Sequence, residues 1–134
     1  MKFRSFERRD LDGIIRICKA ERWESYYDPE RTLRALSAAG VVTVVAVEDD
    51  RVVGFAQVLT DGAIRAYLAN MAVAAEARGN GIGRQLIREA IARLDAVYLD
   101  LLSTGDANRF YERFEHTTLP GYRLYWPSEV SPKK

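Results

Sequence analysis

The chain has 134 residues, of which 48% are hydrophobic and 29% are charged, and these values are typical of one globular domain. Its 20 basic and 19 acidic side chains give a net charge of +1, which argues against a dedicated nucleic-acid binder because such proteins carry a basic excess. One cysteine and one histidine exclude a disulfide scaffold and a cysteine-rich zinc site. We expect a single domain over residues 1–134, without a metal site.

The charge pattern and the apolar runs argue against a membrane protein. The first ten residues carry a charge every few positions, which is unlike a signal peptide. The longest apolar run, Val41 to Val47, is far too short to cross a bilayer. The sequence therefore predicts a cytoplasmic protein with no membrane partner.

The first quarter of the chain is predicted to form a strand and two helices. Residues 2–6 alternate charged and apolar side chains, as a short strand does. Asp10 precedes apolar residues at helical spacing from Leu11 to Cys18, which predicts a first helix with Asp10 as its N-cap. Asp28 as an N-cap, followed by Pro29 at the first helical position, predicts the start of a second helix, which stops at Gly40.

The middle of the chain has the pattern of a three-stranded meander. Val41 to Val47 is typical of a buried strand, and Val52 to Leu59 returns after a charged turn. Asp61-Gly62 marks a second tight turn. Ile64 to Val73 then forms the third strand.

The last third of the chain alternates helices and strands. Ile82 to Leu94 predicts a helix, Val97 to Leu102 a strand, and the residues from Asp106 a short helix. Tyr122, Leu124 and Trp126 alternate as a final strand before a polar tail at 127–134. The order β-α-α-β-β-β-α-β-α-β predicts a mixed α/β (α+β) fold with a mostly antiparallel sheet and one parallel crossover.

A glycine-rich segment between a strand and a helix carries the strongest chemical signal. Gly79, Gly81 and Gly83 allow a ligand to approach the backbone closely. Peptide N–H groups at a helix N-terminus favour an anion such as phosphate. Three arginines lie between residues 78 and 88 with no acidic residue among them. We interpret the segment as a site for a phosphorylated ligand; the alternative is a glycine-rich turn beside a solvated arginine face.

The spacing of the glycines excludes two common nucleotide loops. Arg84 stands where a dinucleotide loop has its third glycine, and a P-loop needs a Gly-Lys-Ser/Thr sequence that is absent here. The pattern R/Q-x-x-G-x-G/A is satisfied by Arg78, Gly81 and Gly83. With this motif the chain resembles the GNAT superfamily of acyl-CoA-dependent N-acetyltransferases, and the predicted element order extends the resemblance over nearly the whole chain.

Other segments share the resemblance. They are Ala46-Val47-Glu48, Val53-Gly54-Phe55, Met71-Ala72-Val73, and Asn108 with Phe110-Tyr111. The chain departs from the pattern at Glu115-His116, where many relatives have Gly-Phe.

The resemblance implies acetyl-CoA as the acyl donor. Its pyrophosphate would rest on the backbone N–H groups of residues 79–84, and its pantetheine arm would pair with the backbone near Met71 and Val73, where strands 64–73 and 97–102 splay apart. The implied cofactor-binding residues are Met71, Ala72, Val73, Arg78, Gly79, Asn80, Gly81, Ile82, Gly83, Arg84, Asn108 and Tyr111.

The resemblance also implies direct attack of an amine on the thioester within a ternary complex. The Met71 N–H would stabilise the oxyanion, and Tyr111 would protonate the leaving thiolate. Tyr111 also lies on an apolar helix stripe, so the alternative is an ordinary packing tyrosine. The sequence does not identify the general base. Its candidates are Glu24, Asp28, Asp61 and a water molecule.

The sequence leaves the acceptor open. The hypotheses are a small-molecule amine, a protein α-amine or lysine, and a non-catalytic acyl-CoA-binding module. Aromatic residues of the expected acceptor region favour a cationic or flat apolar amine, although packing or a dimer surface explains them equally well. They are Trp23, Tyr26, Tyr27, Tyr67, Tyr122, Tyr125 and Trp126. A homodimer is implied by the resemblance alone.

Overall fold

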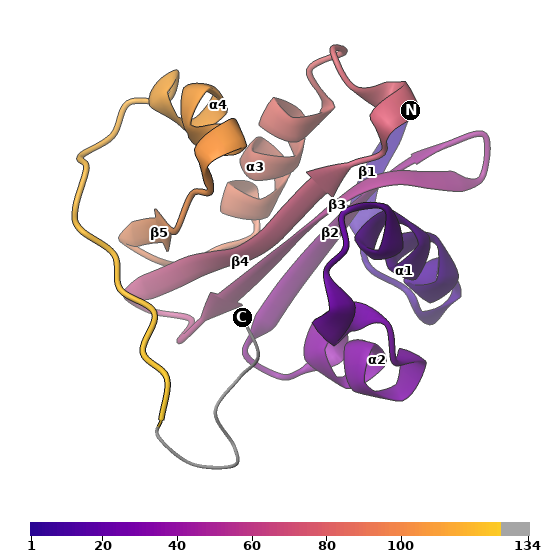
Figure 1. Cartoon of the computed structure of the whole chain (residues 1–134), viewed down its shortest axis with the longest axis horizontal. Coiled ribbons are helices and arrows are strands. Elements are labelled where there is room, and N and C mark those ends of the chain that lie inside the picture. Colours follow the sequence, from indigo (N-terminus) through magenta and orange to yellow (C-terminus); the bar gives the residue numbers. More distant parts are fainter. Residues whose placement is uncertain (127–134) are drawn as a thin grey trace. The chain divides into compact units, whose positions relative to one another are not determined.

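A computed structural model describes residues 1–126 and confirms the mixed α/β fold. Residues 1–101 form one compact unit, and the described residues 102–126 belong to a second. The first unit holds a five-stranded sheet in the order β1-β2-β3-β4-β5 (Figure 1). Its strands are β1 (Lys2–Ser5), β2 (Val41–Glu48), β3 (Arg51–Thr60), β4 (Arg65–Val73) and β5 (Tyr98–Leu101). Neighbouring strands are antiparallel except for the parallel pair β4–β5.

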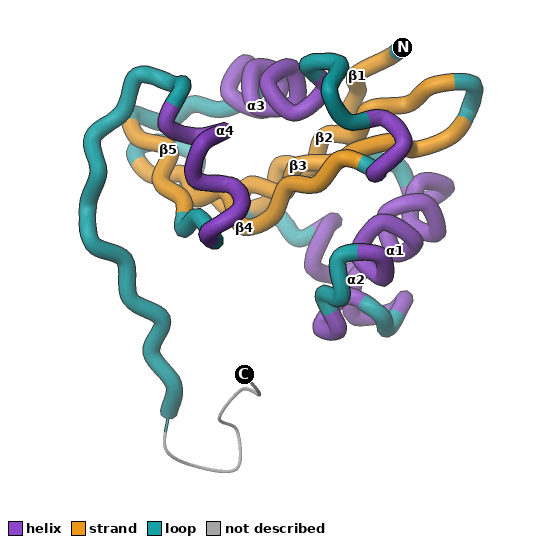
Figure 2. Tube along the Cα trace, turned by 45° about the horizontal axis from the view of Figure 1, so that its top comes forward, coloured by secondary structure: helices purple, strands orange, loops and turns teal. Residues whose placement is uncertain are grey.

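Helices cover both faces of this sheet. The helices α1 (Leu11–Ala20) and α2 (Pro29–Ser37) lie on one face, and α3 (Ile82–Ala92) lies on the other (Figure 2). The core of the α1/α2 face is centred on Phe55, which is fully buried together with Ile14. On the opposite face, a Cβ added to Gly54 would lie only 3.1 Å from Leu86 Cδ1. Gly54 therefore permits the close packing of α3 on β3, and α3 provides the predicted crossover between β4 and β5.

The hairpin turn between β2 and β3 is tighter than predicted. Asp49 and Asp50 have φ angles of 50° and 61°, the left-handed conformations of a two-residue type I′ turn. The strands consequently extend to Glu48 and Arg51, which pair with each other.

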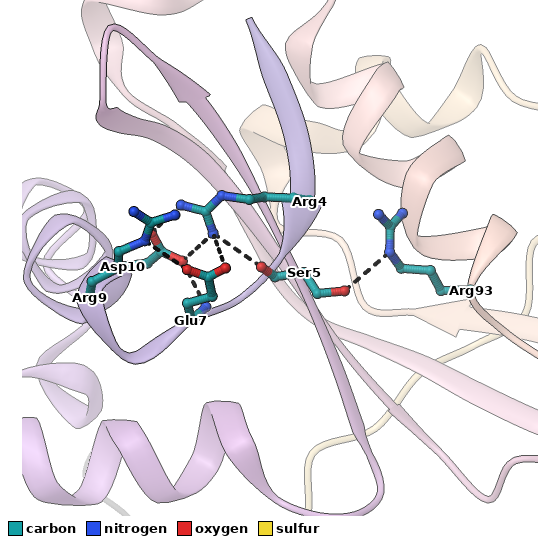
Figure 3. Close-up of polar contacts among 6 residues, drawn as sticks. All are labelled: Arg4, Ser5, Glu7, Arg9, Asp10 and Arg93. Carbon is teal, nitrogen blue, oxygen red and sulfur yellow. Dashed lines mark hydrogen bonds and ion pairs between the residues drawn. The ribbon is translucent and has the colours of Figure 1, made fainter.

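Asp10 does not cap α1 as predicted. Its side chain makes no capping hydrogen bond; it accepts two hydrogen bonds of 2.8 Å from the Arg4 guanidinium and one of 2.7 Å from the Glu7 N–H (Figure 3). Asp10 is buried, with 3% of its surface exposed. A buried carboxylate is stabilised far better by a bidentate arginine than by a helix terminus, and β1 brings Arg4 into reach.

The Arg4–Asp10 pair predicts the effect of Asp10→Ala. The substitution leaves a partly buried guanidinium without its partner and is expected to lower the free energy of unfolding by about 3 kcal/mol at pH 7. Burial raises the pKa of Asp10, but the hydrogen bonds from Arg4 and the Glu7 N–H outweigh burial and lower it below 3.8. The stabilisation is thus present above pH 3.8 and is lost as the pH falls through the lower pKa of the folded state.

Urea denaturation at several pH values checks this prediction. The matched control is Glu76→Gln, which breaks the exposed pair between Glu76 and Arg51, whose atoms are 3.4 Å apart; this change is expected to cost much less. An Asp10→Ala variant as stable as the control, or a loss independent of pH, would contradict the role given to the pair.

The C-terminal part departs from the prediction. Residues 105–107 form a 3-10 turn and α4 spans only Asn108–Glu112. The predicted strand at 122–126 is wrong: none of the described residues after β5 forms a strand. Tyr122 and Leu124 are 80% and 79% exposed. The apolar residues of this segment alternate in the sequence, but no described strand pairs with it. The polar tail 127–134 lies outside the described residues. Within residues 1–126, no helix is long and apolar enough to span a membrane.

Candidate active site

The glycine-rich segment forms an open loop between β4 and α3. A 3-10 turn, Ala75–Ala77, follows β4, and Gly79 and Gly81 then have φ angles of 83° and 77°. These left-handed conformations suit glycine. A Cβ added to either glycine would have no neighbouring atom within 4 Å. The conformation of the loop therefore depends on these two glycines, and there is open space beside its backbone.

The N-terminus of α3 presents backbone donors at this loop. Gly81 is the N-cap, and the Gln85 N–H makes a hydrogen bond of 3.1 Å with the Gly81 carbonyl. The N–H groups of Ile82 and Gly83 precede this bond and have no acceptor within the helix. The Asn80 side chain donates a hydrogen bond of 3.1 Å to the Ala77 carbonyl and stabilises the turn. Such an arrangement of N–H groups suits an anion.

The charged side chain at the start of the motif holds the loop in place. Arg78 Nε donates to the Val73 carbonyl at 3.1 Å, and its guanidinium forms an ion pair of 2.6 Å with Glu21. Arg78 thus joins the loop to the end of β4 and to the residue after α1. Arg84 lies half-buried in the first turn of α3, and Arg88 is exposed one turn later.

The second half of β4 has an open edge within the first unit. Pairing with β5 runs only from Arg65 to Leu68, whereas β4 continues to Val73. The Ala74 N–H donates to the Val53 carbonyl at 2.8 Å. Because backbone groups alternate sides along a strand, those of Met71 and Val73 point away from β3. The Met71 N–H therefore faces the edge beyond the β5 pairing.

A β-bulge separates this open part of β4 from the paired part. Asn70 lies opposite Gln57, but Leu68 lies opposite Val58, so Ala69 is an extra residue on β4. A bulge bends a strand and changes which face its side chains point to. It places Asn70 on the α1/α2 face, together with Gln57.

Three polar side chains meet on that face. Asn70 Nδ2 donates to the Tyr26 hydroxyl, the Tyr26 hydroxyl donates to Gln57 Oε1, and Gln57 Nε2 donates to the Ala35 carbonyl at 3.3 Å. Burial raises the pKa of Tyr26, and the hydrogen bond from Asn70 opposes this rise. Sequence reasoning placed Tyr26 among the aromatic residues but missed Gln57 and Asn70. The available signal was a polar side chain in the interior of each of two apolar strands.

Two of the three side chains that were candidates for the general base have structural roles. Asp28 caps α2 by accepting the Arg31 N–H at 3.0 Å, as predicted for an N-cap. Asp61 Oδ1 accepts three backbone N–H groups in the β3–β4 turn, and these hydrogen bonds lower its pKa, which weakens it as a base. Glu24 is exposed at the start of a 3-10 turn. Burial raises the pKa of Cys18 to about 12, so this thiol is a poor nucleophile.

The backbone, and not the side chain, of two predicted site residues is suited to contact a ligand. Ala72 and Ile82 are 7% and 5% exposed and pack into the core on opposite faces of the sheet. Gly83 is the second residue of α3 and has no left-handed φ angle. The predicted residues from Met71 to Arg84 thus form one continuous strand, loop and helix within the first unit.

Asn108 and Tyr111 lie in the second unit, on α4. Asn108 is the exposed first residue of this helix. Tyr111 is half-buried and contacts Phe110 edge-on, with ring centroids 5.0 Å apart. Burial raises the pKa of Tyr111 above 10.0, so its hydroxyl keeps its proton at neutral pH.

Comparison with known proteins finds a matching family. A family model described as an acetyltransferase (GNAT) domain matches residues 39–116. No curated protein matches the chain in sequence.

Solved structures with the same fold come from several bacteria. A Deinococcus radiodurans protein assigned as an acetyltransferase is 27% identical with a TM-score of 0.72, and the match covers 92% of this chain and 86% of that one. A GNAT-family acetyltransferase of Streptococcus pneumoniae is 22% identical with a TM-score of 0.76, covering 96% and 98%. A Bacillus halodurans protein named a transcriptional regulator is 24% identical with a TM-score of 0.77, covering 93% and 99%.

Proposed function

Because this chain belongs to the GNAT acetyltransferase family, we propose that it transfers the acetyl group of acetyl-CoA to a primary amine of a small molecule. The family makes the protein an acyltransferase. We propose the identity of the acyl donor, the class of the acceptor and the role of each residue. The main support of the proposal is the open glycine loop at the N-terminus of α3, directly after a strand with an open edge.

The residues of the first unit fit acetyl-CoA. The backbone N–H groups of residues 79–84 would bind the pyrophosphate, and this is supported by the open space beside Gly79 and Gly81, where an added Cβ meets no atom within 4 Å. The pantetheine arm would pair with the backbone of Met71 and Val73, in the way that a peptide adds to a sheet edge. Arg78 would support this site by fixing the loop to β4.

The proposed reaction needs no covalent enzyme intermediate. The lone pair of the amine forms the N–C bond, and the electron pair of the C–S bond leaves with sulfur. The Met71 N–H stabilises the oxyanion that develops on the thioester carbonyl. Tyr111 donates a proton to the thiolate, with Asn108 orienting the pantetheine or a water. The amine nitrogen loses one proton to solvent and Tyr111 regains one from solvent, so one acetamide and one thiol are formed and the enzyme returns to its starting state.

Two further proposals concern organisation and assembly. From its length and charge pattern, we propose that the chain acts as one domain in the cytoplasm; from the family resemblance alone, we propose that it forms a homodimer. Sedimentation equilibrium tests the homodimer, since a monomer at all concentrations would contradict it.

Thiol release with acetyl-CoA tests the proposed function. The purified protein is incubated with acetyl-CoA and a panel of small primary amines, and in parallel with peptides that carry a free α-amine or a lysine. We expect amine-dependent thiol release with small amines and none with matched tertiary amines, which cannot form a stable amide. Transfer to peptides alone would assign a protein acceptor. Binding of acetyl-CoA without any transfer would indicate a non-catalytic module.

A further inference from the structure

The hydrogen bonds that join Asn70, Tyr26 and Gln57 have a fixed direction. The Ala35 carbonyl can only accept, so the Gln57 NH₂ group must face it. Gln57 Oε1 then faces Tyr26 and accepts its hydroxyl proton, which leaves the Tyr26 oxygen to accept from Asn70 Nδ2. The Asn70 amide is thereby oriented with its NH₂ group toward Tyr26 and its Oδ1 atom away from it.

The far end of this chain of hydrogen bonds is held rigidly. Helix α2 ends at Ser37, so the Ala35 carbonyl is among the last four, which have no donor within the helix. Gln57 supplies that donor and is only 4% exposed. Thr32 is 1% exposed and donates from Oγ1 to the Tyr26 carbonyl at 2.8 Å, which fixes the Tyr26 backbone.

Asn70 Oδ1 can be reached from solvent. The described hydrogen bonds of the Asn70 side chain use Nδ2 alone. Among residues 1–126, no side-chain nitrogen or oxygen is both fully buried and without a hydrogen-bond partner. An Oδ1 atom that accepts no hydrogen bond from these residues must therefore be accessible. Asn70 itself is half-buried, so the structure presents an oriented acceptor at a partly desolvated position.

Asn70 Oδ1 belongs to the residue next to Met71, whose N–H is proposed to stabilise the oxyanion. Asn70 directly precedes Met71, and consecutive Cα atoms are about 3.8 Å apart. Two aromatic side chains lie near Tyr26: the Trp23 ring centroid is 6.4 Å from that of Tyr26, and Tyr67 contributes to the raised pKa of Tyr26. The site thus combines one carbonyl acceptor with apolar rings.

We propose that Asn70 Oδ1 accepts a hydrogen bond from an N–H of the acceptor amine, and that this amine carries an apolar or aromatic group. Tyr26 and Gln57 are positioning residues that hold the Asn70 amide in the required orientation. The inference rests on the proposed acetyl transfer and names the residue that would bind the acceptor.

This hydrogen bond strengthens during the reaction. The amine nitrogen becomes positively charged as its lone pair forms the N–C bond, so its N–H becomes a better donor to Oδ1. An amide oxygen is too weakly basic to take the proton, which leaves to solvent. Asn70 therefore orients the amine and stabilises the transition state without acting as the general base.

Substitution of Asn70 tests the inference with phenethylamine as the acceptor probe. Its N,N,N-trimethyl analogue, which has no N–H, serves as a competitive inhibitor. Wild-type protein is expected to favour the primary amine. Asn70→Leu should lower kcat/KM for phenethylamine roughly ten- to hundredfold, with the Ki of the trimethyl analogue and the KM for acetyl-CoA unchanged. Tyr26→Phe should produce a smaller change in the same constant for phenethylamine, because the Asn70 side-chain amide is then free to rotate.

Tyr98→Phe is the matched control, since Tyr98 is an exposed tyrosine on β5, and it should leave all three constants unchanged. The inference is overturned if Asn70→Leu weakens both ligands equally, if it weakens neither, or if wild-type protein binds the trimethyl analogue as well as phenethylamine. Failure of wild-type protein to acetylate phenethylamine also overturns it. In that case, transfer to another amine of the panel still supports the proposed function. Absence of transfer to every amine contradicts both this inference and the proposed function.

Discussion

A Gly81→Val variant is expected to bind acetyl-CoA at least roughly a hundredfold more weakly than the wild type while it keeps the fold. A Cβ at this position would meet no protein atom within 4 Å, so the substitution creates no clash within the chain. The valine methyl groups would instead fill the space beside the N–H groups at the start of α3. Several charge-assisted hydrogen bonds to the pyrophosphate would be lost together.

Gly62→Val is an unusually close control for this variant. Gly62 has a φ angle of 78°, against 77° for Gly81, and a Cβ there also meets nothing within 4 Å. Both variants should therefore lose a similar amount of stability, about 1–2 kcal/mol, through backbone strain. Calorimetric titration with acetyl-CoA should show a loss of affinity in Gly81→Val only. Equal affinities in the two variants would contradict the role of the loop.

A Tyr111→Phe variant is expected to lower kcat roughly 10²- to 10⁴-fold, with little change in the KM for acetyl-CoA. Phenylalanine keeps the edge-on packing against Phe110 and removes only the hydroxyl group. The raised pKa of Tyr111 means that the wild-type acid keeps its proton beyond pH 10.0. The contribution of this acid to kcat should therefore persist through neutral pH and disappear only above that value.

Steady-state kinetics over a range of pH measure this effect. Tyr98→Phe again supplies a tyrosine substitution away from the proposed site, and its kcat should equal that of the wild type. A Tyr111→Phe variant with undiminished kcat would show that Tyr111 is a packing residue and that the thiolate obtains its proton elsewhere.

Local sequence patterns predicted most of the first unit. The meander, the helix after the glycines and the Asp28 cap depend on contacts between residues close in sequence, so periodicity and capping preferences were sufficient. Helix α1 was predicted for the same reason. The cap assigned to Asp10 was wrong because its true partner, Arg4, lies on a strand.

Features that depend on pairing between strands were not predicted. The bulge at Ala69 has no signal in the composition of β4, yet it determines which face Asn70 points to. The network of Asn70 with Gln57 depends on the cross-strand register that the bulge produces. The alternation at 122–126 was read as a strand, but alternation alone does not supply the partner that a strand requires.

The thermal midpoint of the wild-type protein, measured with and without acetyl-CoA and with ATP and NADH as controls, shows whether the chain binds acetyl-CoA. At about a hundred times its dissociation constant, a ligand stabilises the folded state by roughly 2.7 kcal/mol, which raises the midpoint of a domain of this size by several degrees. We expect this rise with acetyl-CoA and none with the two controls. An unchanged midpoint with acetyl-CoA, or an equal rise with ATP, would contradict this expectation.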